Sequence, residues 1–147
     1  MKLEEKLSMK GELTVIHRNS DGKILNAFTV PNLVVTVGKN YIASRMAAAS
    51  ATVMSHMAIG TGTATPVAGN TTLGTEAGRV ALTSFTATNN TVTASATFPA
   101  GTGTGAITEA GILNAASSGT LLCRTVFPVV NKAAGDSIAI TWAVSVV

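Results

Sequence analysis

Charged and aromatic side chains are scarce in this sequence. Charged residues make up 12% of the 147 residues, which is about half of the roughly 25% that is usual for soluble domains. Aromatic residues make up only 4%, so the sequence offers little on which the bases of a single-stranded nucleic acid would stack. The net charge is +3, but the lysines and arginines are scattered and form no basic stripe. We therefore predict that nucleic acid is not a partner.

Cysteine is also rare, and long apolar runs are absent. The single cysteine, Cys123, cannot form an internal disulfide, which is typical of a chain made in a reducing cytosol. No stretch approaches the roughly 18 consecutive apolar residues of a membrane helix. The first residues include Glu4 and Glu5, where a secretory signal would carry an apolar segment. We expect neither a membrane partner nor secretion.

The patterns that the sequence does contain indicate β-structure. The segments "TVTASATF" (91–98) and "IAITWAVSVV" (138–147) alternate apolar and polar residues with a period of two. Asp21-Gly22 and the run 88–90, "TNN", are turn signals between such segments. We predict an all-β fold, an antiparallel β-sandwich or jelly roll. A surface with so little charge suits a chain that other subunits or a larger particle cover.

Two regions depart from simple alternation. The segment "NLVVTV" (32–37) is rich in β-branched residues and predicts a further strand. In "RVALTSFTA" (79–87) the apolar phase slips between Leu82 and Phe85, which indicates a β-bulge.

The chain is predicted to form one domain preceded by an arm. Residues 1–10 mix both signs of charge and are too short for a stable isolated helix, so we expect an N-terminal arm, followed by a single domain over 11–147. One short α-helix is expected over about residues 39–50, where alanines are frequent. Its apolar stripe would consist of Tyr41, Ile42, Arg45, Met46 and Ala49.

Neither glycine-rich loop has the surroundings of a phosphate site. "GTGTAT" (60–65) lacks the Lys-Ser/Thr ending of a P-loop, and helix-breaking residues follow it. "GTGTGA" (101–106) resembles a dinucleotide fingerprint, but Gly111 interrupts the segment that would have to be its helix. We predict that these glycines form turns and that the protein holds no nucleotide cofactor.

The remaining polar residues do not assemble into a catalytic or metal-binding pattern. His17, His56 and Cys123 have no ligand spacing, so no metal site is expected and both histidines are interpreted as ordinary strand residues. A Ser–His–Asp set with Asp21 or Asp136 is conceivable, but no nucleophile elbow is present. Cys123 is interpreted as a small buried residue, with a reactive thiol activated by the neighbouring Arg124 as the alternative. We predict that the protein is not an enzyme.

Two glutamates occupy the same tetrapeptide. Glu76 and Glu109 both lie in "TEAG", each after a run rich in glycine and threonine. Such carboxylates can accept hydrogen bonds from loop N–H groups or pair with Arg79 or Arg124. A catalytic pair would need a cleft with both acids about 5–10 Å apart, and nothing else in the sequence indicates a sugar cleft. We therefore expect Glu76 and Glu109 to fix loops.

From Met57 to Val147 the sequence resembles small virion proteins of tailed bacteriophages. The resemblance rests on "AIGTGTATPVAGNTTLGTEAGR", "FPAG", "ITEAGILN", "LLCRTVFPVVNK" and "GDSIAITW", which occur in this order. These motifs are structural ones rich in glycine and threonine, so they specify a fold family better than a station on the particle.

The resemblance implies a capsid cement, or decoration, protein. Such a protein is a jelly-roll-like sandwich on the capsid exterior that bridges subunits of the major capsid protein and stabilises the assembled head by binding it. It would be made in the host bacterial cytoplasm, and its partners would be the major capsid protein and a second copy in a homodimer. The alternative is a tail-fibre or baseplate-associated module, either structural or receptor-binding. A binding domain or enzyme outside the virion is the third interpretation.

The arm is the expected contact with the capsid. It would be disordered in the free protein and ordered on the shell. The candidate contact residues are Lys2, Leu3, Glu4, Lys6 and Leu7.

Overall fold

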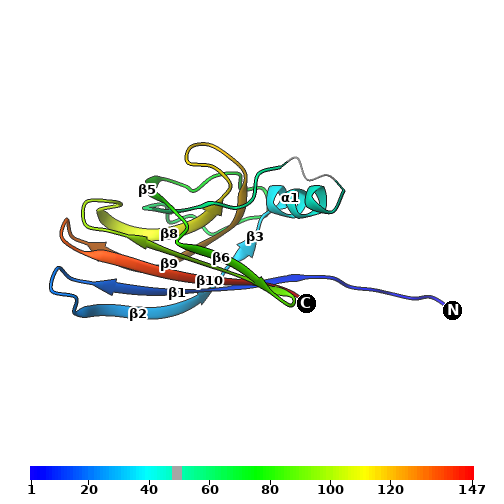
Figure 1. Cartoon of the computed structure of the whole chain (residues 1–147), viewed down its shortest axis with the longest axis horizontal. Coiled ribbons are helices and arrows are strands. Elements are labelled where there is room, and N and C mark those ends of the chain that lie inside the picture. The colour runs from blue at the N-terminus through cyan, green and yellow to red at the C-terminus, as the bar shows by residue number, and fades with distance from the viewer. Residues whose placement is uncertain (48–50) are drawn as a thin grey trace.

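The structure is a computed structural model that describes residues 1–47 and 51–147. In these residues the chain forms two five-stranded antiparallel sheets and one short helix, which confirms the all-β sandwich (Figure 1). The elements are β1 (Met9–Arg18), β2 (Ile24–Pro31), β3 (Leu33–Val34), α1 (Thr36–Ala47), β4 (His56–Gly60), β5 (Glu76–Ala81), β6 (Ser84–Thr88), β7 (Thr91–Phe98), β8 (Gly105–Leu113), β9 (Leu121–Lys132) and β10 (Ser137–Val146).

The first sheet has the order β2-β1-β10-β7-β6. The last strand of the chain is therefore its central strand, paired with β1 on one side and β7 on the other. Alternate residues of β10 face the second sheet, and Trp142 is completely buried among them. The period of two in the sequence thus predicts correctly which face of this strand is in the core.

The second sheet has the order β3-β9-β8-β4-β5. Its inner face packs on the first sheet and contributes large side chains such as Met57, Ile59 and Ile112 to the main core. Its outer face carries a second, smaller apolar cluster that includes Leu73 from the loop 61–75. Both faces of this sheet are therefore covered.

The phase slip between Leu82 and Phe85 marks a change of sheet and not the predicted bulge. β5 ends at Ala81 in the second sheet, and β6 begins at Ser84 in the first. The apolar phase changes because the two strands bury opposite sides of the chain against the same core. Alternation alone cannot distinguish a bulge from such a crossing, because both shift the phase.

The predicted strand over 32–37 is mostly wrong. Only Leu33 and Val34 pair with β9, and helix α1 begins at Thr36. Packing overrides the β-propensity of this segment: Val35 is buried in the outer cluster, and the bare Cα of Gly38 allows the helix to lie against the backbone of Leu122. The helix ends at Ala47, and the predicted extension over 48–50, including Ala49, lies outside the described residues.

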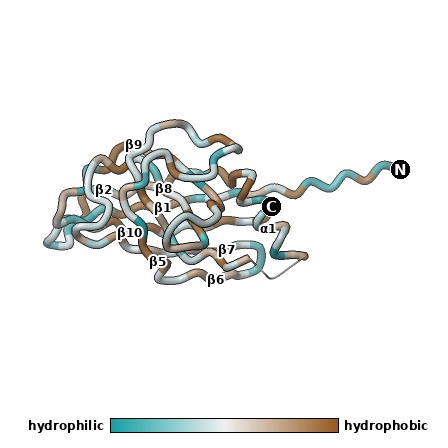
Figure 2. The backbone as a smooth tube through the Cα atoms, turned by 90° about the horizontal axis from the view of Figure 1, so that it is seen from above, coloured by the Kyte–Doolittle hydropathy of each residue, from teal (hydrophilic) through white to brown (hydrophobic). Residues whose placement is uncertain are grey.

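Helix α1, the N-terminal arm and the C-terminus lie at one end of the sandwich, and the β1–β2 and β9–β10 turns lie at the other (Figure 1). The extended arm projects away from the sheets in two perpendicular views (Figures 1 and 2). Strand β1 begins at Met9 and the backbone of Ser8 is hydrogen-bonded to Val147, so the projecting segment is 1–7 and the predicted boundary at residue 10 falls within the strand. We call the end that carries α1, the arm and the C-terminus the helix end of the molecule.

Candidate functional site

A buried ion pair lies on the outer face of the second sheet. Glu109 of β8 is fully buried and Arg124 of β9 is 1% exposed. The two residues are diagonal neighbours on adjacent strands, because Arg124 pairs with Gly111. The Arg124 Nε donates to Glu109 Oε2 at 2.9 Å, and the Nη2 atom lies 2.8 Å from the same oxygen. Loop 61–75 covers the pair.

The carboxylate of Glu109 also holds this loop. Its Oε1 accepts hydrogen bonds from the N–H groups of Gly62 at 2.9 Å and Thr75 at 2.7 Å, and its Oε2 accepts one from Gly74 at 2.9 Å. The loop comes this close because Gly62 has no side chain: a Cβ there would overlap the carboxylate and lie 2.9 Å from the Cα of Gly74. The first glycine-rich stretch therefore surrounds a carboxylate that belongs to the chain itself.

The surroundings of Glu109 favour its charged form. Burial opposes ionisation and raises the pKa, but the three loop N–H groups and the guanidinium together outweigh burial and hold the pKa of Glu109 below its ordinary value. The site thus contains an ionised acid with all its lone pairs directed at donors of this chain. A carboxylate so enclosed has no open side toward a ligand.

Glu76 makes different contacts from Glu109. It is exposed at the start of β5 and pairs with Arg79, whose Nη2 lies 2.6 Å from Glu76 Oε1. The Nη1 of Arg79 also donates to the carbonyl oxygens of Ala115 and Ser118. Arg79 thereby fastens the β8–β9 loop to β5. The two "TEAG" acids both pair with Gly60 of β4, Glu76 from one side and Glu109 from the other. They do not line a common cleft, because Glu109 is fully buried under loop 61–75 while Glu76 is exposed, and each holds a different arginine.

The two histidines have different environments. His17 is buried and its Nε2 lies 2.8 Å from Asp136 Oδ2, and this carboxylate also accepts the N–H of Ala133. The hydrogen bonds from His17 and Ala133 hold the pKa of Asp136 below its ordinary value. His56 instead contacts the adjacent Ser55. In residues 1–47 and 51–147 no serine hydroxyl contacts His17, so the conceivable Ser–His–Asp set is not assembled.

Cys123 and Lys132 are also buried. Cys123 lies in the main core, and burial raises the pKa of its thiol far above the ordinary value. Arg124 does not activate the thiol, because its guanidinium is on the opposite face of β9 with Glu109. Lys132 is 1% exposed and donates to the carbonyl of Pro99 at 2.9 Å. Burial lowers the pKa of Lys132. No group of three metal-ligating side chains occurs among the described residues.

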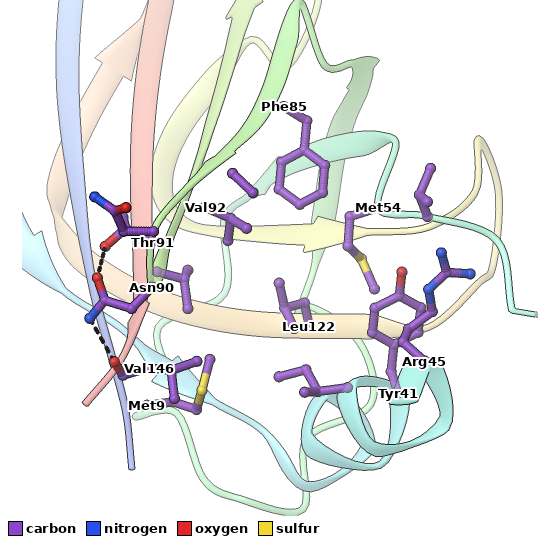
Figure 3. A pocket seen from close by; sticks show the side chains of 15 residues that line it. Met9, Tyr41, Arg45, Met54, Phe85, Asn90, Thr91, Val92, Leu122 and Val146 are labelled. Atoms are coloured by element: carbon purple, nitrogen blue, oxygen red, sulfur yellow. Dashed lines mark hydrogen bonds between the residues drawn. The ribbon is translucent and has the colours of Figure 1, made fainter. Parts of the chain in front are cut away.

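The helix end is open and apolar. A cavity of about 520 Å³, which we call the helix-end cavity, lies between α1 and strands β6 and β7 (Figure 3). Tyr41 and Arg45 reach toward it from α1, Phe85 and Val92 border it from β6 and β7, and Leu122 lies at its centre in the view of Figure 3. Its polar groups are mainly at the margin, where Asn90 Nδ2 donates to the carbonyl of Val146 at 2.8 Å. Among the residues that the structure describes, no carboxylate lines it.

A second cavity lies on the other side of the helix. This arm-side cavity of about 420 Å³ is bordered by Leu7 of the arm, Leu33, Ile42 and Met46. Met46, which the sequence assigned to the apolar stripe of the helix, is 87% exposed. Helix α1 is therefore flanked by apolar surface on both sides, and in the described residues it does not reach the length and apolarity that a membrane span requires.

The arm residues that the sequence proposed as contacts all lie exposed in solvent. The Nζ of Lys2 and the Oε1 of Glu4 are 3.0 Å apart on the surface, and Leu3 and Leu7 are 86% and 76% exposed. Lys6 is exposed as well. Sequence reasoning did not identify the helix-end cavity. The available signal was the slip at Phe85, where a large aromatic leaves the strict alternation just before the chain turns into β7.

In a comparison with protein families, residues 29–144 match the family described as phage tail-collar fibre protein, N-terminal. No curated protein and no solved structure matches the chain. The matched segment begins in β2 and ends in β10, so it includes most of both sheets, the glycine-rich loop and the residues of the helix-end cavity from α1 to Val144. This result supports a phage structural protein and a component of the virion. It fits the tail-fibre alternative better than the capsid cement interpretation. The chain belongs to the family of phage tail-collar fibre proteins, and the part of that family that it matches is the N-terminal domain.

Proposed function

We propose that this protein is a structural module of a phage tail fibre, held in the tail by protein–protein contacts and without catalytic activity. The observation that carries the proposal is the family match over residues 29–144. The capsid cement function that the sequence first indicated has no comparable support, nor has a homodimer that bridges capsid subunits.

The distribution of polar groups agrees with a structural module. The best-organised polar cluster, around Glu109 and Arg124, is buried inside the protein, and loop N–H groups and the Arg124 guanidinium occupy its carboxylate. The accessible cavities at the helix end are lined mainly by apolar side chains. Surfaces of this kind suit contact with another protein, because apolar area is what such contacts remove from water.

A receptor-binding tip for sugars is less well supported. Sugar sites commonly use exposed aromatic rings, and the only tryptophan, Trp142, is completely buried in β10. The only tyrosine, Tyr41, is half-buried beside the helix-end cavity. We therefore favour a role in holding the fibre over a role in recognising a carbohydrate receptor.

The test is the place and copy number of the chain in purified particles. Quantitative mass spectrometry should find few copies per particle relative to the major capsid protein, and gold-labelled antibodies should mark the tail in electron micrographs. A ratio near one copy per capsid subunit, with label over the head, would replace this proposal by the cement function. Absence from purified particles would contradict both.

A further inference from the structure

We propose that the arm of one copy, residues 1–7, binds in the helix-end cavity of a second copy, with Leu3 and Leu7 as the apolar anchors. The inference concerns how copies of the chain associate. It holds equally for a tail or a head location, so its failure and that of the proposed function are distinguishable.

In an extended arm, three apolar side chains and one carboxylate share a side, namely Met1, Leu3, Leu7 and Glu5. Leu3 and Leu7 share a face in an extended chain, where alternate residues point the same way, and also in a helix, where residues four apart do. Both are mostly exposed in the free chain, as is Met1. Glu4 and Glu5 lie between the two leucines. The arm therefore leaves in water the apolar side chains that a partner surface would cover.

The base of the arm directs it away from its own cavity. The backbone N–H of Ser8 donates to the carbonyl of Val147, and the N–H of Val147 donates back to Ser8, each at 2.8 Å. These bonds extend the β1–β10 ladder to residue 8 and point the chain outward, as Figures 1 and 2 show. Residues 1–7 contain no glycine, proline, asparagine or aspartate, so they lack the residues that favour a reversal. Seven extended residues reach about 23 Å, which is enough to cross into a neighbouring molecule.

The cavity matches the arm in size, polarity and charge. Its volume is about 520 Å³, which accommodates more than one leucine side chain, and its walls include Met54, Phe85 and Leu122. Arg45 contributes a positive charge at the cavity, and its Nη1 also donates to the carbonyl of Ala51. Among the described residues, no acidic side chain lines the cavity. Glu5 complements this charge, because it lies on the same side of an extended arm as Leu3 and Leu7, whereas Glu4 is paired with Lys2.

The arm and the helix-end cavity lie at the same end of one molecule. Each copy therefore offers one arm and one cavity, and mutual exchange closes a dimer or a small ring without leaving a free arm. The arrangement resembles the swapping of a terminal segment, in which a flexible element fills the same kind of site in a partner.

Cross-linking between isotopically distinct copies tests the contact directly. A diazirine-bearing aliphatic amino acid is placed at position 3 of unlabelled protein, which is mixed with ¹⁵N-labelled protein before irradiation. We expect cross-links from position 3 to ¹⁵N-labelled peptides that contain residues 41–45 or 85–92. Cross-links within one copy only, or to labelled peptides elsewhere, would overturn the proposal.

Matched variants test the two sides of the contact by sedimentation velocity over a range of protein concentrations. The double change Leu3→Ser with Leu7→Ser should weaken self-association at least about tenfold, because two buried leucines are lost. The control is Lys2→Ser with Lys6→Ser, which alters the other face of the same arm. It should leave the strength of self-association nearly unchanged.

On the cavity side, Ala87 lines the cavity from edge strand β6 and is exposed. Ala87→Trp should fill the space and weaken association, whereas Ala27→Trp, at an exposed alanine of the opposite edge strand β2, should not. Circular dichroism and thermal unfolding show that each variant is folded. A wild-type protein that stays monomeric at millimolar concentration, or a Leu3/Leu7 variant that associates as well as wild type, would overturn the proposal.

Discussion

The outer face of the second sheet and the helix end of the molecule differ in how completely the chain covers them. At the outer face, glycines allow loop 61–75 to close over a charged pair, so that Glu109 and Arg124 are completely covered. At the helix end, large apolar side chains surround a cavity of about 520 Å³ that the described residues leave open. The first region is closed by its own loop, and the second is open.

This difference indicates which region maintains the fold and which is available to a partner. A buried charge is costly unless it is paired and hydrogen-bonded, so the contacts of Glu109 must form within the folded chain itself. An apolar cavity contains no group that must be hydrogen-bonded. Its only cost in stability is the apolar contact that its lining side chains do not make. Substitutions should therefore reduce stability strongly at the closed region and weakly at the open one.

The largest effect is expected for Glu109→Gln. The neutral amide leaves the buried Arg124 charge uncompensated and turns an NH₂ group toward loop N–H donors. Removing one partner of a buried pair costs about 3–5 kcal/mol, and we expect this loss in the free energy of unfolding measured with urea. Glu76→Gln is the control, because its pair with Arg79 is partly exposed and should cost about 1 kcal/mol or less. Equal losses for the two variants would contradict the distinction between the closed pair and the surface pair.

A smaller effect is expected for Gly62→Ala. The added Cβ would overlap the Glu109 carboxylate and approach the backbone of Gly74, so the loop must move away from its anchor. Overpacking of this kind costs about 1–3 kcal/mol. The control is Gly69→Ala in the same loop, where a Cβ meets no atom within 4 Å and the stability should stay the same or rise slightly. A stable Gly62→Ala protein would show that the loop is not held closely on Glu109.

The pH dependence of stability should identify the same carboxylate. The pKa of Glu109 is lower in the folded protein than its ordinary value of 4.5, so the unfolded chain takes up the proton first as the pH falls. The contribution of Glu109 is complete above the ordinary pKa and is lost as the pH falls through the folded pKa. The gap in unfolding free energy between wild type and Glu109→Gln should therefore narrow in acid. The pKa of Asp136 is lowered too, but this acid is present in both proteins and cancels in the difference. A gap that is constant from about pH 6 to about pH 3 would contradict the assignment.

Much of the sandwich could be predicted from the sequence because burial on one face of a strand imposes a period of two. The alternation of Leu13, Val15 and His17 in β1 and of Ala94 and Ala96 in β7 appears as buried positions in the structure. The turn at Asn89 has the positive φ of 54° that its asparagine favours. These features depend on local pattern, which a single sequence contains.

Features that depend on pairing between distant segments could not be predicted in the same way. Glu109 was a candidate because of its setting, but its contact with Arg124 depends on the β8–β9 register, which contains two irregularities. Helix α1 begins three residues before the predicted start, because Val35 just before it is buried in the outer cluster and Gly38 lies against the backbone of Leu122. The local propensities of 32–37 do not reveal these contacts. The helix-end cavity combines residues from several elements, and the slip at Phe85 marks only one of them.

The smallest effect is expected at the open region, for Phe85→Ala. Phe85 is half-buried and borders the helix-end cavity, so truncation removes contacts on one side only and enlarges a space that already exists. We expect a loss of about 1 kcal/mol, below the roughly 1.5–3 kcal/mol of a fully buried side chain. Phe98→Ala is the matched control, because Phe98 is completely buried between the sheets and its truncation should cost about 3–5 kcal/mol. If the two changes cost the same in urea unfolding, Phe85 belongs to the closed core, and the helix end has no open apolar surface for a second copy to bind.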